Sequence, residues 1–133
     1  MENKDTRWKL RFENYLTTLA NFDQIIPADG STSEFEKYAL VQRFEFAFDL
    51  SWKVMQDYLK YVGYFDIRGP RPCIMQMAQD GLIDPFVWEE LLNARNESGD
   101  SFDDSKNQIY FDKIVNDFLP VLREFKDKMV AKQ

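Results

Sequence analysis

Apolar residues recur along most of the chain at spacings of three and four, the period of an α-helix that is buried along one side. The first such stretch, residues 6–26, predicts a long helix with a single apolar stripe. Residues 27–31, which include proline, aspartate, glycine and serine, predict a loop after it. The stripe consists of Trp8, Phe12, Tyr15, Leu16, Leu19 and Phe22.

A second stretch, residues 33–62, predicts the longest helix and is apolar on more than one side. Ser33 and Glu36 have the spacing of a capping box, and Gly63 is placed to end the helix. A helix that is apolar on several sides is normally central or shared with another subunit. Its main stripe comprises Leu40, Phe44, Ala47, Phe48, Ser51, Met55, Tyr58, Leu59 and Val62, and a second face carries Val41, Phe48 and Trp52.

Two shorter helices are predicted after the longest one. The sequence Gly-Pro-Arg-Pro at residues 69–72 predicts an extended turn, and a helix over residues 72–79 should follow and end at Gly81. Asp84 and Pro85 have the character of an N-cap and a first helical residue. They predict a fourth helix that ends near Asn96, supported by Phe86, Val87, Leu91, Leu92 and Ala94.

The remainder of the chain predicts one more long helix. Residues 97–105 are polar and acidic, and the helical pattern resumes near Asp104 and continues to about residue 131. Pro120 lies inside this pattern and should kink or split the helix, because it lacks the backbone N–H that the preceding turn requires. The apolar positions are Ile109, Phe111, Ile114, Val115, Phe118, Val121, Leu122 and Phe125.

These segments predict an all-α fold, an up-and-down helical bundle of about five helices, three long and two short. A chain of 133 residues suits a single domain spanning residues 1–133. The long second helix carries more apolar surface than one bundle seam needs, since Phe46 and Trp52 fall off its main stripe. We therefore expect a two-fold homodimer.

Composition narrows the class of protein. A hydrophobic fraction of 44% with 16% aromatic residues is enough for a well-filled core. The formal net charge of −6 argues against binding to duplex nucleic acid. One cysteine, Cys73, permits no disulfide within the chain and suits a reducing cytosol. No apolar run has the length of a signal peptide or a membrane span, so we expect a cytoplasmic protein without membrane contact.

The absence of histidine limits the available chemistry. It removes the usual general base near neutral pH and the commonest metal ligand. Asp100, Asp103 and Asp104 could hold a divalent cation through oxygen ligands. A solvated loop whose aspartates cap the next helix is the favoured interpretation, because the rest of a calcium-loop pattern is missing. We expect no catalytic residue, no metal and no cofactor.

Charged residues near the middle of the longest helix allow two interpretations. Glu45, Asp49 and Lys53 share one side at i, i+4 spacing, and Arg43 lies close by. They form either a surface ladder of ion pairs or half-buried charges that need partners, and the sequence favours neither. Arg95, followed by Asn96, could bind phosphate or carboxylate with its fork, although an arginine that interacts with the helix dipole is the more ordinary role.

At these residues the sequence resembles the nucleotidyltransferase substrate-binding proteins, part of the wider HEPN group of helical bundles. The resemblance rests on the segments LVQRFEFAFDLSWKVMQDYLKYVGY, GPRPCIMQMAQDGLI and ARNESGDSFDD, and extends over residues 8–128. The Arg-Phe-Glu of residues 43–45, with Trp52 and Lys53, and the pair Arg95 and Asn96 are its most specific parts.

The resemblance implies a five-helix bundle that forms a homodimer and works with a separate small nucleotidyltransferase subunit, for which it binds the substrate. Related bundles are ribonuclease toxins, whose motif begins with arginine and continues to a histidine and then a tyrosine. Arg95 and Asn96 match that motif, and Asp103 matches an acidic position after it. Asp100 replaces the histidine and Phe102 replaces the tyrosine.

The sequence thus predicts a non-catalytic substrate-binding or partner subunit of a small nucleotidyltransferase, whose ligand would be a nucleotide or a nucleotidylated substrate. The expected ligand cleft lies near Arg95 and Asn96, with further candidates in Arg43, Glu45, Lys53, Asp100 and Asp103. One alternative is a HEPN-type ribonuclease or a degenerate relative that uses Arg95 and Asp100. A second alternative is a structural dimeric bundle without a ligand.

Overall fold

The computed structural model describes residues 4–25, 33–97 and 104–133, and nearly all of them are helical. The elements are α1 (Lys4–Ile25), α2 (Glu34–Tyr61), α3 (Pro70–Gln79), α4 (Pro85–Glu97), α5 (Asp104–Lys113) and α6 (Leu119–Val130), with a π-helical turn, η1 (Ile114–Phe118), between the last two. No strand occurs in these three ranges, so the all-α prediction is confirmed. Among the helices described, none is long and apolar enough to cross a bilayer.

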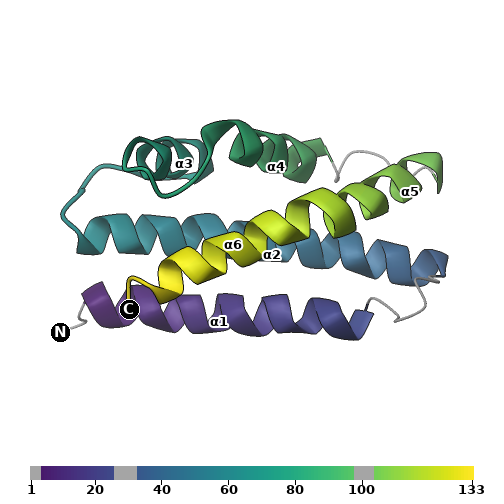
Figure 1. Cartoon of the computed structure of the whole chain (residues 1–133), viewed down its shortest axis with the longest axis horizontal. Coiled ribbons are helices and arrows are strands. Elements are labelled where there is room, and N and C mark those ends of the chain that lie inside the picture. Colours follow the sequence, from purple (N-terminus) through teal and green to yellow (C-terminus); the bar gives the residue numbers. More distant parts are fainter. Residues whose placement is uncertain (1–3, 26–32, 98–103) are drawn as a thin grey trace.

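The helices form four antiparallel runs (Figure 1). Helices α1 and α2 run in opposite directions, α3 and α4 together form the third run, and α5, η1 and α6 form the fourth. The fourth run crosses the others obliquely and brings the C-terminus close to the first turns of α1 (Figure 1). This arrangement is the predicted up-and-down bundle, in which two short helices replace one long helix in the third run.

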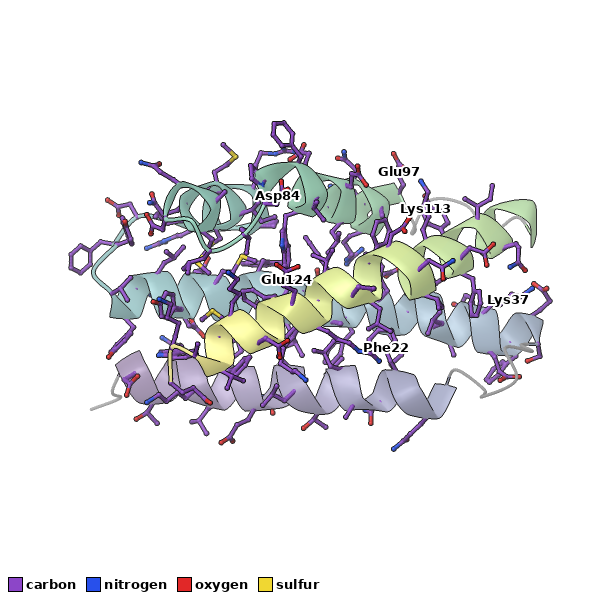
Figure 2. The ribbon with its side chains drawn as sticks, in the orientation of Figure 1. Phe22, Lys37, Asp84, Glu97, Lys113 and Glu124 are labelled. Atoms are coloured by element: carbon purple, nitrogen blue, oxygen red, sulfur yellow. The ribbon has the colours of Figure 1, made fainter. Side chains whose placement is uncertain are left out.

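Helix α2 is the centre of the bundle, because it packs against α1, α3, α4, α5 and α6. The prediction that its apolar sides make it central is confirmed. Figure 2 shows Phe22 of α1 turned towards the interior, whereas Lys37, Glu97 and Lys113 lie at the periphery. The side chains that are fully enclosed include Trp8, Trp88, Tyr15, Phe12, Phe44, Phe48, Phe125 and Met55.

Both ends of α2 are closed by the local interactions that the sequence predicts. The Ser33 hydroxyl accepts a bond from the Glu36 amide at 3.2 Å, and the Glu36 carboxylate accepts one from the Ser33 amide at 3.1 Å. Gly63, with φ of +116°, takes the left-handed conformation that allows the Tyr64 amide to reach the Leu59 carbonyl at 2.9 Å. The capping box and the C-terminal glycine are thus confirmed.

Helix α3 begins earlier than predicted. Its first residue is Pro70 rather than Pro72, and the segment predicted as an extended turn forms the first helical turn. Proline is tolerated there because first-turn amides have no partner within the helix. Gly69, with φ of +85°, precedes the helix, and its amide donates to the Gln56 side chain at 3.0 Å.

Pro120 is accommodated by a change in helical pitch. The ring leaves no N–H for the carbonyl four residues earlier, and the backbone widens into the π turn Ile114–Phe118, where the Leu119 amide donates to Ile114. The chain continues as α6 without a loop. The predicted interruption is confirmed, as a π turn that separates two α-helical segments.

Three residues assigned to apolar positions are exposed instead, and Phe86, near the start of α4, is the most exposed of them at 81%. Val62 is the C-cap of α2 and 46% of its surface is accessible, because the helix ends there. Ile109 is 57% exposed, since a difference of two residues places it on the opposite side of the helix from the buried Phe111. The other stripe positions of the first two long helices are buried or partly buried.

The core assignment can be tested with two phenylalanines of α2. Phe48 is fully buried and contacts Phe44 and Trp88, whereas Phe35 is 79% exposed. Phe48→Ala should lower the free energy of unfolding by about 3–5 kcal/mol, because it leaves a cavity. Phe35→Ala, which alters no packed side chain, should change it by less than about 0.5 kcal/mol. Urea denaturation followed by circular dichroism measures both, and equal effects would contradict the packing described.

Candidate functional site

A cluster of charged residues connects α4 to α2. The Arg95 guanidinium, in the last turn of α4, donates from Nε and Nη2 to the two carboxylate oxygens of Asp49, each at 3.2 Å. Its Nη1 lies 3.6 Å from the Glu45 carboxylate. We call Glu45, Asp49 and Arg95 the charge cluster.

The i, i+4 spacing of Glu45 and Asp49 places both carboxylates on the side of α2 that α4 covers. The side chains of Glu45, Asp49 and Arg95 are 24%, 34% and 31% exposed, so the cluster is accessible at its edge and enclosed behind. Of the two interpretations that the sequence left open, the structure supports half-buried charges with partners. The bidentate bond between Arg95 and Asp49 fixes the plane of the guanidinium.

The electrostatics of the cluster hold Arg95 in its charged form. Hydrogen bonding to Asp49 raises the pKa of Arg95, and the charges of Asp49 and Glu45 act in the same direction, while partial burial opposes them. The guanidinium therefore cannot exchange a proton near neutral pH. Arg95 can instead bind an anionic or polar group, which would replace part of its contact with the carboxylates of Glu45 and Asp49.

The other predicted site residues are not all brought to this cluster. Lys53 continues the same side of α2, with its amine 5.8 Å from the centre of the Trp52 ring. Arg43 is exposed and lies two residues before Glu45, which places it on a different side of the helix. Asn96 is exposed beside Arg95. Asp100 and Asp103 lie outside the described residues.

The structure also contains an ion pair that sequence patterns did not reveal. Asp57 of α2 is buried, and the Nε of Arg11 in α1 lies 2.7 Å from its Oδ2. The N–H is not aligned with this oxygen, which accepts no hydrogen bond within the described chain, so the contact is chiefly an attraction between charges. The position of Asp57 among the apolar residues of α2 was a signal that it would be buried and need a partner. Nothing in the sequence identified Arg11 as that partner, because it is far away along the chain.

Cys73 is buried in the core beside α2. Burial, and secondly the charge of Asp57, raise the pKa of the thiol to about 11. The thiol is consequently protonated at physiological pH and has neither the charge nor the access of a nucleophile. Across the described residues, no group of acidic or cysteine side chains is arranged to hold a metal ion.

Comparison with known protein families identifies the chain. A family model described as nucleotidyltransferase substrate binding protein like matches residues 10–131, nearly the whole length. The chain belongs to this family. The resemblance seen in the sequence is therefore confirmed, and the match includes every residue of the charge cluster. Among curated proteins, none gives a significant match.

Membership in the nucleotidyltransferase substrate-binding family gives the general role of the chain, that of a substrate-binding partner of a nucleotidyltransferase. The described part of the chain has an all-α architecture. The family description specifies neither the substrate nor the residues that bind it.

Proposed function

We propose that this chain is a non-catalytic subunit that binds the substrate of a separate small nucleotidyltransferase, with the ligand held next to the charge cluster. The family match over residues 10–131 supports the role. The observation that carries the location is Arg95, an oriented and permanently charged guanidinium that is 31% exposed at the edge of the helix interface.

The geometry favours binding over catalysis. The ligand would offer a phosphate or carboxylate to Arg95, which has five N–H donors in a fixed fork. Of the contacts described for Arg95, the one between its Nη1 and Glu45, at 3.6 Å, is the longest and the easiest to replace. Asp49 would keep the guanidinium oriented through the exchange, and Lys53 would supply a second positive charge along the same side of α2.

The chemistry of the chain supports the same view. General acid–base catalysis near neutral pH needs a group whose pKa lies close to the working pH. The chain contains no histidine, Cys73 has a pKa of about 11, and the pKa of Arg95 is raised from an already high value. A bound substrate would therefore be presented to the transferase rather than converted by this chain.

The test uses the tagged protein expressed in its native cells. A nucleotidyltransferase should co-purify with it, and the complex should transfer a labelled nucleotide to a co-purified substrate. Arg95→Gln should reduce this labelling by about tenfold or more, since a charge-assisted bond contributes about 1.5–3 kcal/mol. The ion pair between Arg95 and Asp49, which this substitution breaks, is about one-third exposed. The free energy of unfolding should therefore fall by less than about 1 kcal/mol.

Arg71→Gln is the matched control. Arg71 of α3 also binds a carboxylate of another helix, since its Nη1 donates to both oxygens of Glu89 in α4, at 2.6 and 2.7 Å. This pair is more exposed than the charge cluster and belongs to the start of α3. Labelling should be unchanged in this variant. If Arg95→Gln supports as much labelling as the wild type, the ligand does not bind at the charge cluster. If no nucleotidyltransferase co-purifies, the proposed role itself is contradicted.

The ribonuclease alternative makes an opposite prediction. Metal-independent cleavage of RNA needs a proton-transfer group near pH 7 and a cation that stabilises the phosphate. Arg95 supplies the cation, but Asp100 occupies the position of the toxin histidine. We expect the purified protein to leave labelled single-stranded RNA intact, with or without magnesium. Cleavage that disappears in Arg95→Ala would favour the ribonuclease over the binding subunit.

We also propose that the chain forms a two-fold homodimer through α1 and α2. Phe46 and Leu10 are more than half exposed, and Leu10 lines a shallow surface depression with Leu50. Trp52, the other residue expected at this interface, packs partly against the core instead.

Light scattering should give about twice the mass of a 15.9 kDa chain at micromolar concentration. Phe46→Glu should yield the mass of one chain, because a charge in an apolar interface has no partner. Phe86→Glu, at an exposed position on α4, should remain dimeric. A wild-type protein with the mass of one chain would rule out the dimer.

A further inference from the structure

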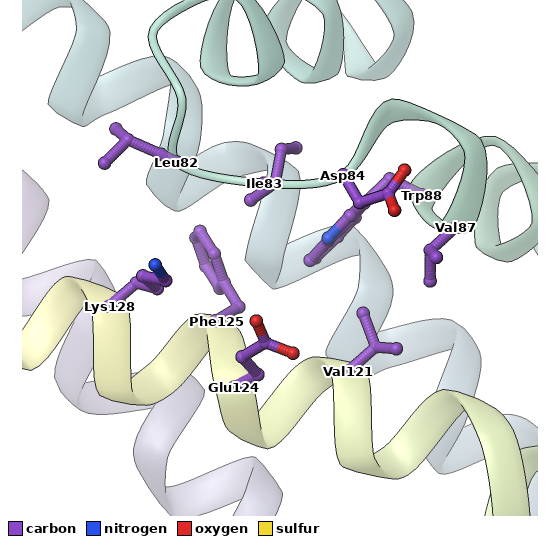
Figure 3. Close-up of a pocket in the computed structure, with 9 residues that line it drawn as sticks. All are labelled: Leu82, Ile83, Asp84, Val87, Trp88, Val121, Glu124, Phe125 and Lys128. Atoms are coloured by element: carbon purple, nitrogen blue, oxygen red, sulfur yellow. The ribbon is translucent and has the colours of Figure 1, made fainter.

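A small recess lies between α6 and the connection from α3 to α4 (Figure 3). Its volume is about 170 Å³. We call it the apolar recess, because six of its nine lining residues are apolar. Its lining consists of Leu82, Ile83, Asp84, Val87, Trp88, Val121, Glu124, Phe125 and Lys128.

The walls of the apolar recess are fixed by local structure. Gly81, with φ of +79°, ends α3 and lets the Leu82 amide bond to the Met77 carbonyl at 3.0 Å. Asp84 then caps α4, since its Oδ1 accepts the Phe86 amide at 2.9 Å. The short connection between these two caps is therefore held across from α6.

The inner wall is formed by two buried rings. Trp88 and Phe125 are 2% and 1% exposed and meet edge to face, with ring centres 5.4 Å apart. Trp88 also contacts Phe48, and Phe125 also contacts Tyr15, so neither ring is free to rotate into the recess. The recess is therefore already formed before a ligand binds.

Three charged side chains line the apolar recess: Asp84, whose carboxylate caps α4, and Glu124 and Lys128 of α6. Glu124 and Lys128 are one turn apart on α6, and Figure 3 shows both side chains on the side of the recess. A glutamate four residues before a lysine commonly forms an ion pair with it. No such pair forms here, and neither residue has another ionic partner within the described chain. A carboxylate and an ammonium group are thus both available next to an apolar hollow.

We propose that the apolar recess binds a small zwitterion with an apolar side chain, of which a free apolar α-amino acid is the simplest case. The side chain would enter the recess, the ammonium group would pair with Glu124, and the carboxylate would pair with Lys128. This goes beyond the proposed function, because the recess lies at the start of α4 and the charge cluster lies at its end.

The size of the recess limits the ligand. An apolar protein cavity of about 150 Å³ accommodates benzene, and the recess measures about 170 Å³. A phenyl ring or a leucine side chain fits that volume, whereas a drug-sized molecule needs a pocket of roughly 300 Å³ or more. The spacing of the two charges along one helical turn suits the adjacent ammonium and carboxylate groups of an amino acid.

The test is a titration of the full chain with L-phenylalanine and L-leucine, followed by the indole N–H signals in NMR spectra. The chain has three tryptophans, and Trp88→Phe identifies the signal of Trp88. This signal should shift in a saturable way, while that of the remote Trp8 stays in place. Phenethylamine lacks the carboxylate and 3-phenylpropionate lacks the amine, so each should bind about tenfold more weakly.

Variants that remove one charge at a time show which residue binds the amine of the ligand and which binds its carboxylate. Glu124→Gln should weaken L-phenylalanine about tenfold and leave 3-phenylpropionate unchanged, because that ligand has no amine. Lys128→Gln should weaken L-phenylalanine equally and leave phenethylamine unchanged. Lys126→Gln, on the opposite side of α6, is the control and should bind like the wild type. Val121→Phe should fill the recess and abolish binding, with the helical circular dichroism spectrum retained.

Three results would overturn the proposal. The first is no saturable shift of the Trp88 signal up to the solubility limit of both amino acids. The second is an equal affinity for the amino acid and for either single-charge analogue, which would mean that the two charges do not act together. The third is binding that survives Val121→Phe, which would place the ligand elsewhere. None of these measurements involves a nucleotidyltransferase, so their outcome is independent of the proposed function.

Discussion

The second helix must be covered on almost every side, and the arrangement of the other helices follows from this requirement. Its buried residues include Leu40, Val41, Phe44, Phe48 and Leu59, which spread over much of the helix circumference. Burial of such side chains contributes about 1.5–3 kcal/mol each. No single neighbour can cover them all, so α1, α4 and the α5–α6 run pack around α2 as a common centre.

The same burial forces the enclosed acidic residues of α2 to find cations on other helices. Asp57 faces α1 and meets Arg11, while Glu45 and Asp49 face α4 and meet Arg95. A carboxylate removed from water is costly unless it is paired. The charge cluster therefore has a structural role in attaching α4 to α2, and a ligand that binds Arg95 would act on that attachment.

The short helices of the third run create the second concave feature. Because Gly81 ends α3 and Asp84 begins α4, the chain crosses α6 as a short connection, and the apolar recess remains beneath it. The two candidate ligand sites thus depend on α4, one at each end. The buried rings of Trp88 and Phe125 hold this helix to the core between them.

The sequence alone determined the helical class and the order and approximate extent of the helices, because these depend on local signals, and it determined the family, because the family motifs can be read along the chain. The spacing of apolar residues, the capping box of Ser33 and the glycines at 63 and 81 act within a few residues of chain. Only the tertiary structure decided which charges meet, since Arg95 and Asp49 are 46 residues apart. It also decided that α3 starts at Pro70, because the preceding Gly69 bonds to Gln56, which is distant in sequence. It decided that Ile109 faces solvent, because that depends on the exact phase of the helix.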